Sequence, residues 1–186
     1  MSTAAVTTQT PALTTWSIDP AHSHVEFAVK HLMIATVKGR FGILQGTVQT
    51  DEADPSKGTV DVEIDADSID TRQAQRDAHL KSADFFDAEK FPKLTFKSTR
   101  IHDVDGDDFK LSGDLTIHGV TRPVTLDVTS EGRGKDPWGG DRAGFSATGK
   151  IKRSEFGLTW NQVLETGGFA VGDDIKISLD VELVKQ

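Results

Sequence analysis

The residues in this 186-residue chain that could do chemistry are its six histidines and its 29 acidic residues. His22 and His24 stand two positions apart, so on an extended strand their rings would share one side and could chelate a metal ion. The other four histidines are His31, His79, His102 and His118. They fall in separate segments, and a zinc site needs three or four ligands with spacing that gathers them. The histidines therefore predict no metal site.

An acidic hexapeptide resembles a calcium-binding loop. It runs from Asp103 to Asp108, and Asp114 stands at what would be the twelfth loop position. A calcium loop of that kind needs Gly at its sixth position, where this chain has Asp108, and helices on both sides. The flanking residues read as strands here, so we expect a solvated hairpin turn.

No enzyme template is found among the remaining residues. The chain lacks a Gly-x-Ser-x-Gly nucleophile elbow, a His-Glu-x-x-His zinc motif and any cysteine nucleophile. Acidic residues such as Asp61, Glu63 and Asp180 alternate with apolar ones, so they face outward and keep the protein soluble rather than forming an acid and base pair. We therefore expect a protein that is not an enzyme and needs no cofactor.

Charge and composition exclude several classes of partner. The net charge is −8, and no local basic patch reverses it, so a nucleic-acid partner is not expected. Without cysteine there is neither a disulfide nor a thiolate metal site. Residues 1–15 are rich in Ser, Thr, Ala, Gln and Pro and predict a disordered N-terminal tail. No apolar run is long enough for a membrane span, and we expect a cytoplasmic protein.

The elements that must position these residues show as an alternation of apolar and polar residues from Trp16 onward. This period of two is typical of antiparallel strands with one buried face. Eight such segments run over Ser23 to His31, Gly39 to Thr50, Thr59 to Ala66, Lys93 to Ile101, Phe109 to Ile117, Val120 to Ser130, Ala143 to Lys152 and Ile175 to Leu183. Turn residues such as Asp105-Gly106 join them as hairpins.

A meander of eight hairpin-linked strands has two edge strands with unpaired backbone N–H and C=O groups, and closure into a barrel pairs these two strands with each other. We therefore predict an all-β fold, an antiparallel up-and-down eight-stranded lipocalin-like barrel over residues 16–186. One short helix is expected from Arg72 to Lys81, where Asp70 and Gln73 resemble a capping box, and it would plug or line one barrel mouth.

The aromatic residues predict an apolar interior. There are ten phenylalanines and three tryptophans but no tyrosine, the aromatic residue with a hydroxyl group. An eight-stranded barrel is about the size at which the interior either fills with side chains or keeps room for a ligand. Composition leaves both alternatives open.

Several motifs in order resemble the YceI-like family, and together they cover residues 16–184. They are Ile18-Asp19-Pro20-Ala21-His22-Ser23, Val29-Lys30-His31, Gly39-Arg40-Phe41, Asp84-Phe85-Phe86-Asp87, Phe91-Pro92-Lys93-Leu94-Thr95-Phe96, Leu115-Thr116-Ile117-His118-Gly119-Val120-Thr121 and Arg153-Ser154-Glu155-Phe156-Gly157. The resemblance implies a lipocalin-like barrel whose long tunnel holds a polyisoprenoid, in proteins that are often homodimers. Many relatives are exported, whereas the tail of this chain carries no export signal.

The resemblance and the strand alternation together predict which side chains line the tunnel. They are Val25, Phe27, Val29, His31, Phe41, Val62, Phe85, Phe86, Phe96, Leu115, Phe145 and Phe156. His31 would lie on the buried face and bond either a ligand headgroup or a backbone carbonyl. Arg72, Arg76 and Arg153 are candidates to meet a pyrophosphate.

The predicted function is to bind, store or transport a long apolar lipid, a polyisoprenoid or an isoprenoid quinone, inside the barrel. Two alternatives stay open at this stage. The first is an enzyme that acts on an isoprenoid lipid within the barrel, which would need an inward polar pair. The second is a solid-core interaction module whose outer surface binds a partner.

Overall fold

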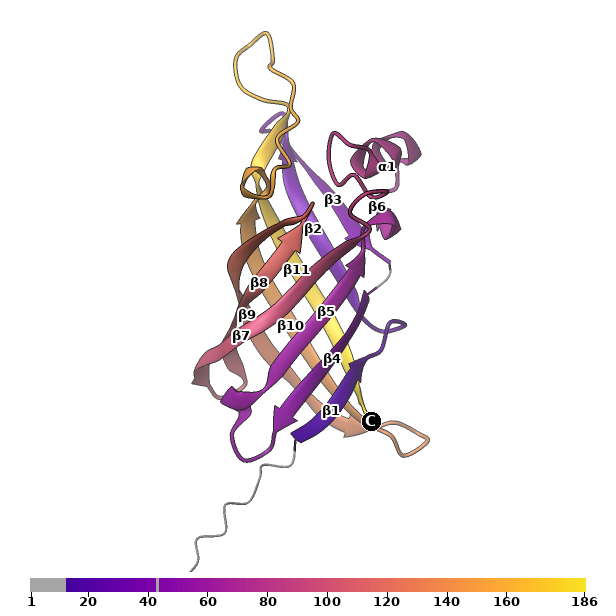
Figure 1. The fold of residues 1–186 in the computed structure, drawn as a ribbon, viewed down its shortest axis with the longest axis vertical. Coiled ribbons are helices and arrows are strands. Elements are labelled where there is room, and N and C mark those ends of the chain that lie inside the picture. The colour runs from indigo at the N-terminus through magenta and orange to yellow at the C-terminus, as the bar shows by residue number, and fades with distance from the viewer. Residues whose placement is uncertain (1–12, 43) are drawn as a thin grey trace, which may run out of the picture.

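Antiparallel strands make up most of the regular structure in the computed structural model, which describes residues 13–42 and 44–186 (Figure 1). The strands are β1 (Leu13–Ile18), β2 (His24–His31), β3 (Ala35–Phe41), β4 (Leu44–Asp51), β5 (Thr59–Asp65), β6 (Ile69–Asp70), β7 (Lys93–Asp105), β8 (Asp108–Ile117), β9 (Val120–Lys135), β10 (Asp141–Lys152) and β11 (Val171–Lys185). One helix, α1 (Ala74–Lys81), lies between β6 and β7.

Eight of the strands close into a barrel. Their order is β1-β4-β5-β7-β8-β9-β10-β11, and β1 pairs again with β11 to complete the ring. Every pairing is antiparallel, so the predicted all-β, eight-stranded barrel with a single short helix is confirmed. Closure gives each of these strands two hydrogen-bonded neighbours and leaves no free edge among them.

The barrel has more strand segments than predicted because one side of it is broken. Both β1 and β2 pair with β11. Strand β1 pairs with residues 183–185 of β11, and β2 pairs with Val171 and with residues 175–180, so β1 and β2 share one place in the ring. In the same way, β3 and β4 share the next place. The predicted strand from Gly39 to Thr50 is therefore interrupted after Phe41, where the amide of Gly42 donates to the carbonyl of Ser68 instead of to a strand partner.

The N-terminal boundary differs from the prediction. Strand β1 begins at Leu13, which pairs with Asp51 of β4, so residues 13–15 belong to the barrel and not to a tail. Alternation could not show this, because Leu13-Thr14-Thr15 has no clear apolar period. The rest of the predicted tail, residues 1–12, lies outside the described residues.

The helix is shorter than predicted. Arg72 has a φ of 61°, and a left-handed residue cannot continue into a right-handed helix. Helix α1 therefore begins at Ala74, and the side chain of Gln73 caps it by accepting from the amide of Arg76. Asp70 bonds the amide of Arg72 instead of closing the expected capping box. No helix in the described ranges is long and apolar enough to cross a bilayer.

Four charged side chains hold the bend between β1 and β2 against the barrel wall. Arg142 of β10 donates to Asp19 at 2.7 Å, to Glu182 at 2.9 Å and to Asp136 at 3.0 Å. Asp19 also accepts from the ring of His22 and from the amide of Ala21. These bonds lower the pKa of Asp19 to about 2, with His22 contributing most.

We predict that Asp19→Asn destabilises the fold at neutral pH but not in acid. Because the folded-state pKa of Asp19 lies below its ordinary value of 3.8, its contribution is complete above about pH 5 and is lost as the pH falls toward 2. At neutral pH we expect a loss of about 1 to 2 kcal/mol. Thermal melts of both proteins at several pH values should converge at low pH.

A matched control is Asp61→Asn, which removes an exposed carboxylate paired with Lys97 at 3.5 Å. Its melting temperature should follow that of the unsubstituted protein throughout. A gap between Asp19→Asn and the original protein that stays constant down to pH 2 would contradict the proposed charge contribution.

Candidate functional site

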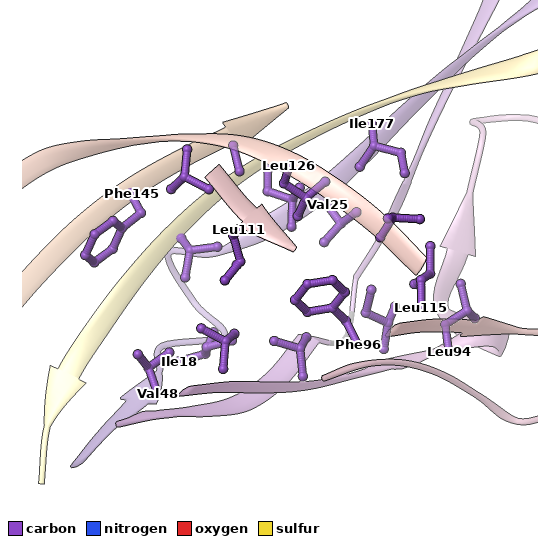
Figure 2. Close-up of a pocket in the computed structure, with 18 of the residues that line it drawn as sticks. Ile18, Val25, Val48, Leu94, Phe96, Leu111, Leu115, Leu126, Phe145 and Ile177 are labelled. Atoms are coloured by element: carbon purple, nitrogen blue, oxygen red, sulfur yellow. The ribbon is translucent and has the colours of Figure 1, made fainter. Parts of the chain in front are cut away.

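The barrel encloses a cavity of about 750 Å³, and side chains from β1, β2, β3, β4, β5, β7, β8, β9, β10 and β11 border it. Figure 2 shows Ile18, Phe96, Leu111 and Phe145 reaching into this space from different sides of the wall. The volume lies within the range of about 300 to 1,000 Å³ typical of small-molecule sites. The interior is therefore hollow, not filled.

Alternate residues of the strands supply most of the apolar lining of the cavity. On β11 the lining residues include Ile175, Ile177, Leu179, Val181 and Leu183, while Lys176, Ser178 and Asp180 between them are exposed. The distance along β11 from the first to the last of these lining residues is roughly 26 Å at about 3.3 Å per residue. The lining is thus long, continuous and apolar.

Two glycines let aromatic rings lie against the wall. A Cβ atom added at Gly113 would stand 2.4 Å from the Cζ atom of Phe96, and one added at Gly39 would stand 2.4 Å from that of Phe27. Neither approach is sterically possible with a larger residue unless the ring moves. The phenylalanines occupy the space above these glycines, which leaves the middle of the barrel open.

The two ends of the cavity differ in chemistry. We call the end beside α1 the helix end and the end where β1 starts and β11 finishes the terminal end (Figure 1). At the helix end Leu80, Phe85 and Phe86 border the cavity, so the last turn of α1 and the segment after it line this mouth. The terminal end is bordered by the acidic residues Asp51, Glu52 and Asp107 and by Arg133.

A buried arginine lies at the helix end. Arg153 is 6% exposed, and among the described residues its guanidinium donates to four backbone carbonyls, those of Leu158, Trp160, Val171 and Gly172. Burial lowers the pKa of this guanidinium. Its bonds tie the segment that follows Phe156 to the start of β11, so Arg153 shapes the mouth.

The other two arginines proposed for a pyrophosphate do not border the cavity. Arg76 donates to the hydroxyl and carbonyl oxygens of Thr71, and Arg72 is exposed.

Eleven of the twelve residues predicted to line the tunnel do border the cavity. They are Val25, Phe27, Val29, Phe41, Val62, Phe85, Phe86, Phe96, Leu115, Phe145 and Phe156. The exception is His31, which is exposed and pairs with Ala35 at the end of the β2–β3 hairpin. The prediction that His31 is buried is wrong because β2 continues past the rim of the barrel. Beyond the rim both faces of the strand are exposed, so the alternation of residues no longer indicates which side chains are buried.

The twelve predicted residues cover only part of the lining. The missed residues include Ile18, Val48, Val60, Ile64, Leu94, Leu111, Leu126, Val128, Ala147, Ile177, Leu179 and Val181. Many of them, such as Val60, Ile64 and Leu111, stand on the same alternating face as residues that were chosen, so strand parity alone identifies them.

Ionisable residues that border the cavity are exposed or lie at its ends. They are Glu26, Asp51, Glu52, Asp107, Arg133 and Arg153. The middle of the cavity therefore offers apolar contacts, which bind a hydrocarbon chain without orienting a reacting group.

Two patterns that could suggest a further site have structural explanations. Asp19, His22 and Glu182 place one ligand atom each within 4.8 Å of one another, a spacing that could hold a metal ion. The guanidinium of Arg142 already bonds both carboxylates, so the group is an ion-pair network. The run from Gly144 to Lys150 has the spacing Gly-x-x-x-x-Gly-Lys of a phosphate loop, but it lies within strand β10.

Comparison with known proteins agrees with this architecture. The YceI protein of Salmonella newport is 42% identical over 165 residues, which are 89% of this chain and 83% of that protein. The crystal structure of BcnA from Burkholderia cenocepacia has a TM-score of 0.77 at 28% identity and covers 89% of this chain and 98% of that one.

A more distant structure shares the fold. It is a domain from Saccharophagus degradans described as polyisoprenoid binding, with a TM-score of 0.65 at 16% identity, covering 92% of this chain and 98% of that one. The model of the YceI-like domain matches residues 16–183, so the barrel as a whole, and not one motif, carries the likeness. This chain belongs to the YceI-like family.

Proposed function

We propose that the barrel binds a long apolar lipid, a polyisoprenoid or an isoprenoid quinone, and stores or transports it. The observation that carries this proposal is the cavity of about 750 Å³ with a continuous apolar lining. An empty space of that size lined by Leu, Ile, Val and Phe is poor in partners for water. A flexible hydrocarbon chain matches both its shape and its chemistry.

Burial of the chain supplies the binding free energy. Each buried methylene contributes roughly 0.8 kcal/mol, so each five-carbon isoprene unit contributes on the order of 3 to 4 kcal/mol before the costs of association. A few units are enough for tight binding. Because the hydrophobic effect is nondirectional, the length of the cavity selects the length of the chain, and polar groups at the mouths select the headgroup.

A similarity of fold supports a polyisoprenoid as the class of ligand. The Saccharophagus degradans domain that shares this barrel is described as binding polyisoprenoids, which makes that class the first to test. Transport, cytoplasmic location and homodimer formation remain predictions.

The two alternatives are less well supported by the described residues. A solid-core module requires a filled interior, and the barrel is hollow. An enzyme within the barrel requires ionisable groups facing one another, and those that border the cavity are exposed or stand at its ends. Storage or transport therefore fits the cavity better than turnover.

We predict that folded protein isolated from its own host carries an apolar lipid. Extraction with organic solvent followed by mass spectrometry should release a long-chain species in near-stoichiometric amount. Protein stripped by the same extraction and refolded should take up an added polyprenyl phosphate. Protein that releases no such species and takes up no polyprenyl chain would refute the proposed function.

A second prediction compares two neighbouring positions of β11. Leu179 borders the cavity, whereas Ser178 beside it is exposed. Leu179→Trp places an indole in the lumen and should weaken binding of a long-chain lipid about tenfold or more, since displacing only two methylenes removes roughly 1.6 kcal/mol. Ser178→Trp adds the same bulk to the outer surface.

Both variants should be titrated with a fluorescent polyisoprenoid analogue, and their folding checked by thermal melts. Ser178→Trp should bind like the unsubstituted protein. Equal affinities in all three proteins would place the binding site somewhere other than the cavity.

A further inference from the structure

Five exposed apolar side chains gather beyond the helix end of the barrel. Three of them form the turn between β2 and β3, and two belong to the loop that precedes β11. They are Leu32, Met33, Ile34, Val163 and Phe169, which we call the apolar tip, and their exposed fractions are 36%, 67%, 83%, 78% and 57%. Isolated exposed apolar residues are common, but a cluster of them marks an interaction surface.

The two parts of the apolar tip are joined. The amide of Leu32 donates to the carbonyl of Ala170 at 2.8 Å, and Val163 and Phe169 form a β-bridge across their own loop. In Figure 1 the loop before β11 and the β2–β3 turn project together from the end of the barrel that carries α1. Val29 of β2 borders the cavity, so the turn lies only roughly 10 Å farther along the same strand.

The backbone of the tip is strained. Leu32 has a φ of 51° and Met33 a φ of 58°, with the amide of Ile34 bonded to the carbonyl of His31. Two consecutive residues with positive φ are typical of the type I′ hairpin turn, which favours Asn and Gly at these positions. Large apolar residues here increase both backbone strain and exposure to water, a combination that points to a functional role.

Contrary to the expectation from the sequence, the hairpin that carries the tip forms a local positive patch in a protein whose net charge is −8. Residues 27–50 contain no Asp or Glu, and Glu26, the acidic residue of the hairpin, stands opposite Arg40. Lys30 and Lys38 share the outer face of the hairpin, and among the described residues neither has a carboxylate within ion-pair distance. Arg40 is paired with Asp70, and Glu165 is the acidic residue of the neighbouring loop.

We propose that the apolar tip docks on the surface of an anionic phospholipid bilayer, with Lys30 and Lys38 contacting the headgroups. Apolar side chains flanked by lysines are the composition of interfacial anchors, which insert shallowly and gain from anionic lipid. Docking of this kind turns the helix-end mouth toward the membrane. The inference goes beyond the proposed function, because docking requires no cargo, although it would bring a lipid carrier to its source.

The test is co-sedimentation of the full chain with vesicles. One vesicle preparation contains phosphatidylcholine alone, and the other contains equal parts of phosphatidylcholine and phosphatidylglycerol. We expect binding to the anionic vesicles, and binding about tenfold weaker for the double variant Met33→Asp with Ile34→Asp. Lys30→Glu with Lys38→Glu should weaken binding to the anionic vesicles by about tenfold or more and leave the weak binding to neutral vesicles unchanged.

A matched control lies at the other end of the barrel. Trp138 is 88% exposed and stands in the loop between β9 and β10, so Trp138→Asp removes an equally exposed apolar residue outside the tip. This variant should bind vesicles like the original protein. A loss equal to that of the tip variant would overturn the proposal, and so would equal binding to neutral and anionic vesicles.

Folding and cargo binding are measured on the same samples. The tip variants should keep the thermal melt and the polyisoprenoid affinity of the original protein, because the substituted side chains are exposed and do not border the cavity. If the original protein binds the polyisoprenoid but ignores both kinds of vesicle, the docking proposal fails and the proposed function stands. If it binds vesicles but no cargo, the proposed function fails and docking stands.

Discussion

The pairing of β1 with β11 is the interaction on which the rest of the structure depends. Only Trp16, Ser17 and Ile18 form this ladder, opposite Lys185, Val184 and Leu183, whereas β10 and β11 pair along almost their whole length. The short seam is supported by burial, because Trp16, Ile18 and Leu183 are all less than 10% exposed. Once it forms, the inward faces of eight strands meet around one axis and none of these eight strands is left at an edge of the sheet.

Closure alone would not keep the interior open, because eight strands can also be filled by large side chains. The lining combines branched aliphatic residues with phenylalanines whose rings rest above glycines. Phe96 lies over Gly113 in this way, and Phe27 over Gly39. The ring of Phe41 packs against those of Phe27 and Phe86, with ring centroids 5.8 Å apart in both pairs, and this places aromatic bulk toward the helix end. The cavity therefore depends on glycines in the wall that leave room for the phenylalanine rings beside them.

Much of this could be read from the sequence, because strand parity is a local property. Alternation in Thr59 to Asp65 and in Ile175 to Leu183 identifies the inward residues without knowledge of their partners. What could not be read depends on the whole ring. The alternation that includes His31 does not reveal that β2 has passed the barrel rim. The alternation from Gly39 to Thr50 does not reveal the break after Phe41. The position of the rim and the position of the break both depend on where neighbouring strands end.

The β2–β3 hairpin and the β7–β8 turn lie at opposite ends of the barrel (Figure 1) and differ in charge, and this bears on how the molecule would meet a membrane. At the terminal end the β7–β8 turn holds Asp103, Asp105, Asp107 and Asp108, and Asp51 organises the loop after β4 by accepting from the amides of Ala53 and Asp54. These carboxylates repel anionic headgroups, whereas Lys30 and Lys38 at the helix end attract them. The helix end also carries carboxylates, but Asp67 and Asp84 beside α1 lie within ion-pair distance of Lys81 and His79. Repulsion at the β7–β8 turn and attraction at the β2–β3 hairpin therefore favour the same orientation, with the apolar tip toward the membrane.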